Sequence, residues 1–296
     1  MTNSNVIVYG SGLFNSTKGD FSPKQQLLQM INSQFDTVIL WSLHIDAVGT
    51  LIFNDTPLVK EGTALPALLS LVPYMEQMRS KSKMKNLLFS IGGWDCNDHQ
   101  NMIALWSNDT TRTQLQKNFT VLVQTLDING IDHDLEQHYS QDFQDIVVEL
   151  TVWLHAELNV FTTYCPYTNS GFWLDCLAAV YGKLNEQPVK WFNLQCYAGG
   201  AGNTPSQWVN YVKDYSGRTG VTDVNNFIMP GYWAYTSGFS TSCPCDFEST
   251  FKEISVQGGF LWNSDSVFQN NNTANCRGAA MDMEAYSSAM KAGIAA

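Results

Sequence analysis

The stretch Asn129-Gly130-Ile131-Asp132-His133-Asp134-Leu135-Glu136 decides the fold of this chain. Alternate side chains of a β-strand face the same side, so Asp132, Asp134 and Glu136 share one face and the residues between them share the other. The stretch therefore predicts a buried strand that brings carboxyl groups together toward its end.

Short apolar runs rich in β-branched and aromatic residues recur along the chain, each followed by a helical pattern, as in parallel β/α units. The eight strands expected are 5–12, 36–44, 86–92, 129–136, 159–165, 189–197, 226–233 and 257–262. Helices are expected near 22–33, 66–82, 110–127, 141–156, 170–182, 204–216 and 281–292.

This alternation predicts an α/β fold, a single (β/α)8 TIM barrel in which residues 1–296 form one catalytic domain. The gap at 234–256 is too short to hold a large insertion domain. An open doubly wound sheet is the weaker alternative, because no Gly-x-Gly-x-x-Gly follows the first strand.

Three carboxyl groups stacked inside a barrel cannot all ionise at low cost. Repulsion between like charges and loss of hydration raise the pKa of at least one of them, which keeps a proton available near neutral pH. Glu136 stands at the C-terminal mouth of the barrel, where active sites are built, and is predicted to be a general acid. A structural cluster and a magnesium or calcium site are the alternatives, but no further acidic or histidine residue obviously converges from other strand ends.

The composition narrows the class of protein. Hydrophobic residues make up 44% of the chain and charged residues 15%, which suits a large core and excludes a disordered chain. The formal net charge of −11 argues against nucleic acid and anionic membrane surfaces as partners. No window approaches the ~18 apolar residues of a membrane-spanning helix. Met1 to Asn5 lack the basic and apolar regions of a signal peptide.

The cysteines are expected to be structural. Seven cysteines, at 96, 165, 176, 196, 243, 245 and 276, are too few for a disulfide scaffold, and their odd number leaves at least one unpaired. Cys243-Pro244-Cys245 lacks the spacing of a zinc site. We expect neither a bound metal nor a cofactor.

The strand at 129–136 resembles the D-G-x-D-x-D-x-E signature of glycoside hydrolase family 18, the chitinases and related endo-β-N-acetylglucosaminidases. Three further motifs stand on the expected strands in the expected order. They are Ser90-Ile91-Gly92-Gly93 at strand three, Gln195-Cys196-Tyr197 at strand six, as in hevamine-like plant class III chitinases, and Gly258-Gly259-Phe260-Leu261-Trp262 at strand eight. Any one short motif is a weak signal, but four in order across nearly the whole chain are a strong one.

The resemblance implies retaining hydrolysis assisted by the substrate, one of the exceptions to the two-carboxylate scheme. Glu136 would protonate the glycosidic oxygen while the 2-acetamido carbonyl of the sugar attacks C1. Asp134 would orient the acetamido N–H and balance the developing positive charge, and Asp132 would take up charge or a proton deeper in the barrel. Tyr197 would hold the acetamido oxygen, with Gln195 offering hydrogen bonds beside it.

Aromatic residues at strand ends are candidates for the sugar-binding surface, because pyranose faces stack on indole rings. The resemblance implies that Trp262 forms the apolar floor of the site. Trp94, just past strand three, and Trp233, at the end of strand seven, are expected to line the site, and so is Tyr232. Trp41 is expected to be a core residue.

Three positions stand out against the family pattern. Asn129 replaces the usual first Asp, but its parity points it away from the interior, so only a modest structural effect is expected. Ala198 follows Tyr197 where Asn or Asp is common, which predicts the loss of one contact to the acetamido group. His133 is expected to be a buried neutral histidine with a backbone partner.

The resemblance implies hydrolysis of chitin or chitooligosaccharides, with an N-acetylglucosamine-containing carbohydrate as the partner. An endo-β-N-acetylglucosaminidase acting on N-glycans and a catalytically weak chitinase-like lectin are the alternatives. The presence of Glu136, Asp134 and Tyr197 counts against the lectin. The family's function favours secretion, although no signal peptide is evident at the start of the chain.

Overall fold

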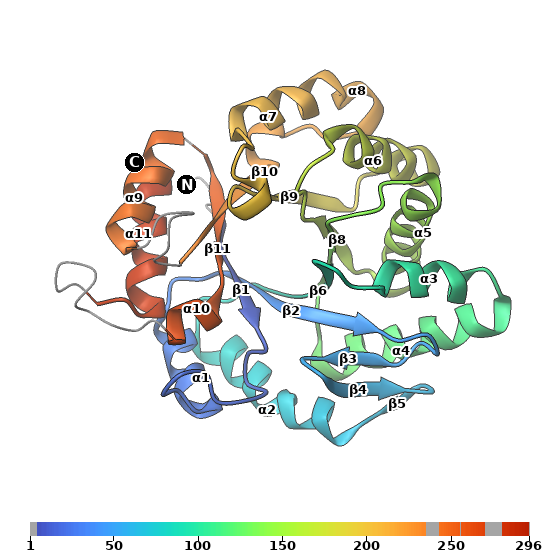
Figure 1. The fold of residues 1–296 in the computed structure, drawn as a ribbon, viewed down its shortest axis with the longest axis horizontal. Helices are drawn as coiled ribbons and strands as arrows, with labels where there is room; N and C mark the ends of the chain where they lie inside the picture. The colour runs from blue at the N-terminus through green and yellow to red at the C-terminus, as the bar shows by residue number, and fades with distance from the viewer. Residues whose placement is uncertain (1–4, 235–242, 255, 270–279, 296) are drawn as a thin grey trace.

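Eight parallel strands close into a barrel in the computed structural model, which describes residues 5–234, 243–254, 256–269 and 280–295 (Figure 1). The barrel strands are β1 (Asn5–Ser11), β2 (Thr37–Ile45), β6 (Asn86–Gly93), β7 (Gly130–Leu135), β8 (Phe161–Tyr164), β9 (Val189–Gln195), β10 (Ile228–Trp233) and β11 (Gly258–Trp262). The ring is closed because β1 pairs with both β2 and β11. The structure confirms the predicted barrel, and each strand lies within its expected run or departs from it by one residue.

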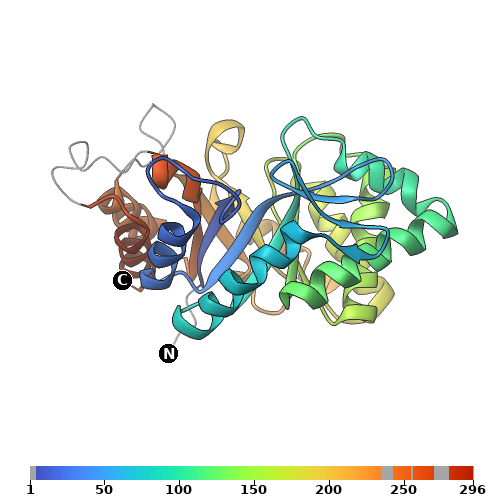
Figure 2. The same ribbon diagram turned by 90° about the horizontal axis from the view of Figure 1, so that it is seen from below.

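Helices surround the strands as the alternation predicts. Those expected from the sequence are α1 (Pro23–Asn32), α2 (Pro66–Lys81), α4 (Asp109–Leu126), α5 (Gln141–Leu158), α6 (Ser170–Leu184), α7 (Pro205–Asp214) and α11 (Met283–Ala295). Helices α1, α2 and α4 follow one another around one side of the barrel (Figure 2). Among the described residues, no helix is long and apolar enough to cross a membrane.

Four further helices were not expected from the sequence: α3 (Asp98–Trp106), α8 (Ser216–Thr219), α9 (Pro244–Ile254) and α10 (Ser264–Gln269). Helix α3 lacks a clear apolar period because half of its buried face is polar, with Asp98 and His99 buried beside Met102 and Leu105. Helix α9 lies in the segment of sequence between β10 and β11, which is long enough for a barrel helix but too short for an inserted domain.

A three-stranded antiparallel extension grows from the end of β2, and the sequence analysis did not predict it. Its strands are β3 (Leu51–Phe53), β4 (Thr56–Lys60) and β5 (Thr63–Ala64), each too short to show a period of two. Asn118 of α4 anchors the extension, accepting from Gly62 N and donating to Gly49 O, both at 2.6 Å. The extension thereby holds the last residues of β2, Leu43 to Ile45, in an antiparallel pairing with β3.

Strand parity divides the core into two layers. Inside the ring, apolar side chains such as Ile7, Ile39 and Phe260 pack together, while larger clusters fill the space between strands and helices. On β7, Asp132 and Asp134 point into the ring. The barrel thus positions two carboxyl groups inside and a third just past the strand end.

Most of the cysteines that the structure describes carry a free thiol. Five have a free thiol, namely Cys96, Cys165, Cys176, Cys196 and Cys245, and three of these are buried. Cys243 is disulfide-bonded. Cys276 lies outside the described residues.

Candidate active site

Asp132 is the deepest of the three carboxyl groups and is fully buried. Its two oxygens accept four hydrogen bonds, from Tyr9 at 2.9 Å, Ser90 at 2.7 Å, Thr163 at 2.6 Å and the amide of Asn193 at 3.0 Å. Burial raises the pKa of Asp132 and these hydrogen bonds oppose the rise. The side chain is therefore held in one orientation by donors from four other strands.

Gln195 joins the two carboxyl groups nearer the mouth. Its amide nitrogen donates to Asp134 Oδ1 at 3.0 Å and to Glu136 Oε1 at 3.1 Å. Trp41 donates from its indole nitrogen to the other oxygen of Asp134 at 2.9 Å. One amide group thus fixes the spacing between the two acids.

The pKa values of both Asp134 and Glu136 are raised, which shifts these acids toward their protonated forms. Burial raises the pKa of Asp134 well above its usual value, with repulsion from Glu136 and Asp132 adding to the rise. Burial also raises the pKa of Glu136, against the hydrogen bond from Gln195. Burial of both acids, with like-charge repulsion added at Asp134, therefore shifts their pKa values upward, the direction that a general acid requires.

The glycine pair of the Ser90–Gly93 motif allows the walls of the site to approach. Gly92 and Gly93 have φ of 110° and 122°, which side-chain-bearing residues rarely adopt. A Cβ on Gly92 would lie 2.4 Å from the carbonyl oxygen of Asp134, and one on Gly93 would lie 2.9 Å from the ring of Trp41. The two glycines therefore leave the room that the Asp134 backbone and the Trp41 ring occupy.

Aromatic rings form the other wall. Tyr197 is buried and stacks on Trp262, with ring centroids 5.6 Å apart and an interplanar angle of 18°. Trp41 meets Trp262 edge-on at 4.9 Å, and Trp233 lies 6.2 Å from Tyr197. The peptide bonds that follow Trp41 and Trp262 are both cis. These four rings pack together, and Trp41 links them to Asp134 through its hydrogen bond.

The structure does not bring all the predicted aromatic residues into this group. Trp233 points inward and donates to Ser266 Oγ at 3.0 Å. Tyr232 faces the opposite side of β10 and packs on Phe247 and Phe251 of α9, because neighbours on a strand alternate.

The positions of Trp94 and Trp41 also differ from those expected from the sequence, which placed Trp94 at the site and Trp41 in the core. Trp94 is 68% exposed and makes no ring contact among the described residues. Trp41, expected in the core, is half-buried instead and belongs to the site through its hydrogen bond to Asp134. Trp41 faces inward by ordinary strand alternation, because Ile39, two residues earlier on β2, packs inside the ring.

The three unusual positions lie apart from the carboxyl groups. Asn129 accepts from Leu87 N at 2.8 Å and donates to Lys85 O and Asn86 Oδ1, which ties β7 to β6 at the far end of the barrel. Ala198 is exposed, with φ of 48°.

His133 is buried as expected, but its partner is a side chain instead of the backbone. Its Nδ1 lies 3.2 Å from Nε2 of His99, and its own Nε2 has no hydrogen-bond partner among the described residues. The expected backbone partner is therefore wrong, because parity turns His133 toward α3, where His99 fills the available space.

The sequence analysis missed several members of the group. Tyr9, Thr163 and Asn193 were not singled out, although each lies at an inward position of its strand. Applying the parity rule to every strand would have found Asn193, two residues before Gln195, and Thr163, two residues before Cys165. Apart from this group, one set of described side chains, His44, Cys96 and Asp98, lies close enough to share a metal ion.

The chain was compared with known families, sequences and structures. The model of glycosyl hydrolases family 18 matches residues 5–218. No curated protein sequence matches the chain.

Solved structures with the same fold cover almost the whole chain. A fungal endo-β-N-acetylglucosaminidase of family 18 has a TM-score of 0.66 and 16% identity, covering 98% of this chain and 97% of its own. The human pseudo-chitinase YKL-39, which retains chitooligosaccharide binding, has a TM-score of 0.67 and 11% identity, covering 99% and 100%. A group IV chitinase of Ostrinia furnacalis in complex with allosamidin has a TM-score of 0.64 and 10% identity, covering 98% and 99%. At these identities the structures show the fold alone, but the family model covers most of the chain, which therefore belongs to glycosyl hydrolase family 18.

Proposed function

We propose that this protein hydrolyses β-1,4 bonds next to N-acetylglucosamine in chitin or chitooligosaccharides, with retention of configuration and with assistance from the substrate. The observation that carries the proposal is the Gln195 amide bridging Asp134 and Glu136. This bridge supports a general acid at Glu136 with a second acid, Asp134, directly behind it.

Exposure supports assistance by the substrate over an enzyme nucleophile. Asp132 is 0% exposed and Asp134 is 1% exposed, while Glu136 is half-buried at the mouth. Attack on an anomeric carbon requires an accessible oxygen, and the protein already donates to both oxygens of Asp132 and of Asp134. The nucleophile is then the 2-acetamido carbonyl oxygen of the sugar itself.

The residues divide the reaction between them. Glu136 gives its proton to the glycosidic oxygen as the bond to C1 breaks, and the acetamido oxygen forms a new bond to C1. Asp134, behind Glu136, balances the positive charge of the resulting oxazolinium ion. Glu136 then takes a proton from water as the water attacks C1. Tyr197 holds the acetamido oxygen, and Trp262 supports the apolar face of the sugar.

The replacement Glu136→Gln tests the acid directly. It keeps the size of the side chain and removes the proton, so kcat/KM on chitotetraose should fall roughly 10²–10⁴-fold while binding is kept. Product chromatography gives the rate, and Glu157→Gln, an exposed carboxyl on α5, is the matched control. Unchanged hydrolysis in Glu136→Gln would overturn the proposed acid.

Two other functions remain as candidates. The fold neighbour that is an endo-β-N-acetylglucosaminidase favours N-glycan cores as an alternative substrate, and the pseudo-chitinase neighbour favours a lectin. Parallel assays on chitotetraose and a high-mannose glycopeptide distinguish the substrates. Binding of chitotetraose without turnover of either would identify a lectin.

A further inference from the structure

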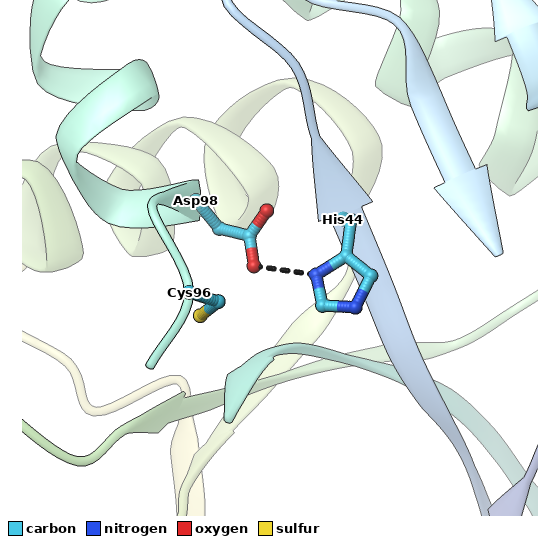
Figure 3. A group of neighbouring side chains, drawn as sticks. All are labelled: His44, Cys96 and Asp98. Atoms are coloured by element: carbon cyan, nitrogen blue, oxygen red, sulfur yellow. Dashed lines mark hydrogen bonds and ion pairs between the residues drawn. The ribbon is translucent and has the colours of Figure 1, made fainter. Parts of the chain in front are cut away.

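A second cluster of reactive side chains lies beside the barrel mouth, apart from the three carboxyl groups. His44 stands near the end of β2, on the part that pairs with β3, and Asp98 is the first residue of α3. Cys96 lies two residues before Asp98, in the loop that follows β6. Figure 3 shows His44 and Asp98 pointing toward each other, with Cys96 next to Asp98. One donor atom from each residue lies within 4.8 Å of the other two.

Hydrogen bonds from neighbouring groups orient two of these side chains. Nδ1 of His44 lies 2.8 Å from Asp98 Oδ2, and its other ring nitrogen lies 2.9 Å from Ser42 Oγ. The backbone N–H of Ile45 donates to Asp98 Oδ1 at 2.7 Å. Each of the two side chains is therefore held through one atom while its other donor atom faces the cluster. Outer partners of this kind are what orient the ligands of metal sites.

We infer that His44, Cys96 and Asp98 form a binding site for a zinc-type divalent ion. The ligand atoms are Nδ1 of His44, Sγ of Cys96 and Oδ2 of Asp98. One nitrogen, one sulfur and one carboxylate oxygen suit zinc and related transition ions, whereas magnesium and calcium prefer oxygen alone. The side chain of His44 is 38% exposed, so water reaches the fourth position of a tetrahedral ion.

Binding requires only small movements. Tetrahedral zinc with bonds of about 2.0 Å to nitrogen or oxygen and about 2.3 Å to sulfur places its ligands roughly 3.3–3.6 Å apart. His44 and Asp98 must open slightly from their 2.8 Å hydrogen bond. The Cys96 thiol, now 3.2 Å from Gly93 O, must turn inward and release its proton. Without an ion, the same residues remain a Ser42–His44–Asp98 chain of hydrogen bonds.

The sequence analysis expected no metal because the ligands do not form a motif. His44 and Asp98 are 54 residues apart, and the single Cys96 has no second cysteine at zinc-site spacing. The pairing with β3 holds the end of β2 that carries His44, and the buried start of α3 places Asp98 against it. The inference is independent of the proposed hydrolysis, since it concerns other side chains.

Metal binding by the full chain tests the inference without an activity assay. The chain is treated with chelator, dialysed and titrated with zinc in a calorimeter, and cobalt is then used as a spectroscopic probe. We expect one ion per chain and a thiolate-to-cobalt charge-transfer band. The Cys96→Ser and His44→Ala variants should each bind zinc at least 100-fold more weakly, and Ser42→Ala, which removes an outer partner, about 10-fold more weakly.

Cys245 supplies the matched control, because its thiol is exposed and remote in sequence from the cluster. Cys245→Ser should keep both the zinc affinity and the charge-transfer band. Circular dichroism of each ion-free variant verifies that it is folded before titration. The inference is overturned if the wild-type chain binds no zinc, or if Cys96→Ser binds as tightly as the wild type. A band lost in Cys245→Ser but kept in Cys96→Ser would also overturn it.

Discussion

The two faces of β7 hold buried ionisable groups of opposite kinds, and the comparison shows what burial of such groups requires. On the inner face, Asp132 and Asp134 are surrounded by donors from six other residues. On the outer face, His133 meets one imidazole, that of His99, and keeps one ring nitrogen without a partner among the described residues. The side chains on both faces are equally buried, so the number of hydrogen-bond donors around a carboxyl group decides where acidic side chains are held in place.

The protonation states follow from the same difference. Burial raises the pKa of Asp132 and Asp134, which shifts both acids toward their protonated forms. Burial lowers the pKa of His99 to about 4 and that of His133 well below its usual value, so both imidazoles stay neutral. Burial thus acts against the charged form on both faces, raising the pKa of the acids and lowering that of the imidazoles.

Removing Asp132 should have the largest effect, because it breaks the inner face. Asp132→Ala leaves the hydroxyls and the amide that donate to this carboxyl group without a buried acceptor, and stability should fall by about 3–5 kcal/mol. Denaturant unfolding followed by circular dichroism measures the change. Asp214→Ala, an exposed position on α7, should change stability by less than about 0.5 kcal/mol. An equally small change at Asp132 would mean that the donors do not depend on it.

Gln195→Leu tests the bridge between the inner acids. It removes the donor shared by Asp134 and Glu136, and the hydrogen bond that opposes the rise in the pKa of Glu136 is lost. The limb of the kcat/KM profile at high pH, where the acid must keep its proton, should therefore move upward by about one pH unit. We also expect kcat to fall roughly 10- to 100-fold. A profile that falls uniformly without moving would assign Gln195 to substrate binding alone.

The outer histidine pair should make the fold sensitive to acid. The pKa of His99 is about 4 in the folded chain and near its ordinary value of 6.5 in the unfolded one. The unfolded chain therefore binds more protons as pH falls below 6.5, and stability declines until the pH approaches 4. This one residue should cost about 2 kcal/mol at pH 5 relative to pH 8.

Replacing both imidazoles together shows whether they cause that decline. The double variant His99→Met with His133→Leu removes both partners at once and should flatten the stability profile between pH 7 and pH 4. Thermal unfolding at several pH values measures it, with the exposed His138→Ala as control. If the stability of the double variant declines as steeply with falling pH as that of the wild type, other groups cause the acid sensitivity.

Asn129→Asp should have the smallest effect of this series. It restores the residue usual in the family but loses the amide donations to Lys85 O and Asn86 Oδ1 at the far end of the barrel. We expect a loss of about 1 kcal/mol in stability and activity within twofold of the wild type. A larger loss of activity would show that the far end of β7 influences the acids at its mouth.

Much of the fold was predictable because its signals are local. The eight strands and seven of the helices follow from periods of two and 3.6 residues, which the chain shows wherever an element is long and its buried face apolar. Helix α3 and strands β3 to β5 were missed because a polar buried face and very short strands carry no such period. Within the site, parity alone placed Asp132 and Asp134 inside the ring.

The contacts that make the site were not predictable in the same way. The Trp41 indole reaches Asp134 across 93 residues, Gln195 reaches Asp134 across 61, and His44 reaches Asp98 across 54. Tyr232 was predicted to line the site because it lies at a strand end. Its side chain instead points to the other face of β10 and packs on α9.

The sequence by itself determined the barrel, the acidic face of β7 and the identity of Glu136 as the acid to test, because alternation along a strand depends only on neighbouring residues. The tertiary structure alone decided which donors meet those acids, which histidine pairs with His133, and that His44, Cys96 and Asp98 share a space. Such contacts depend on how distant segments pack, and no local pattern in the chain encodes a distance between them.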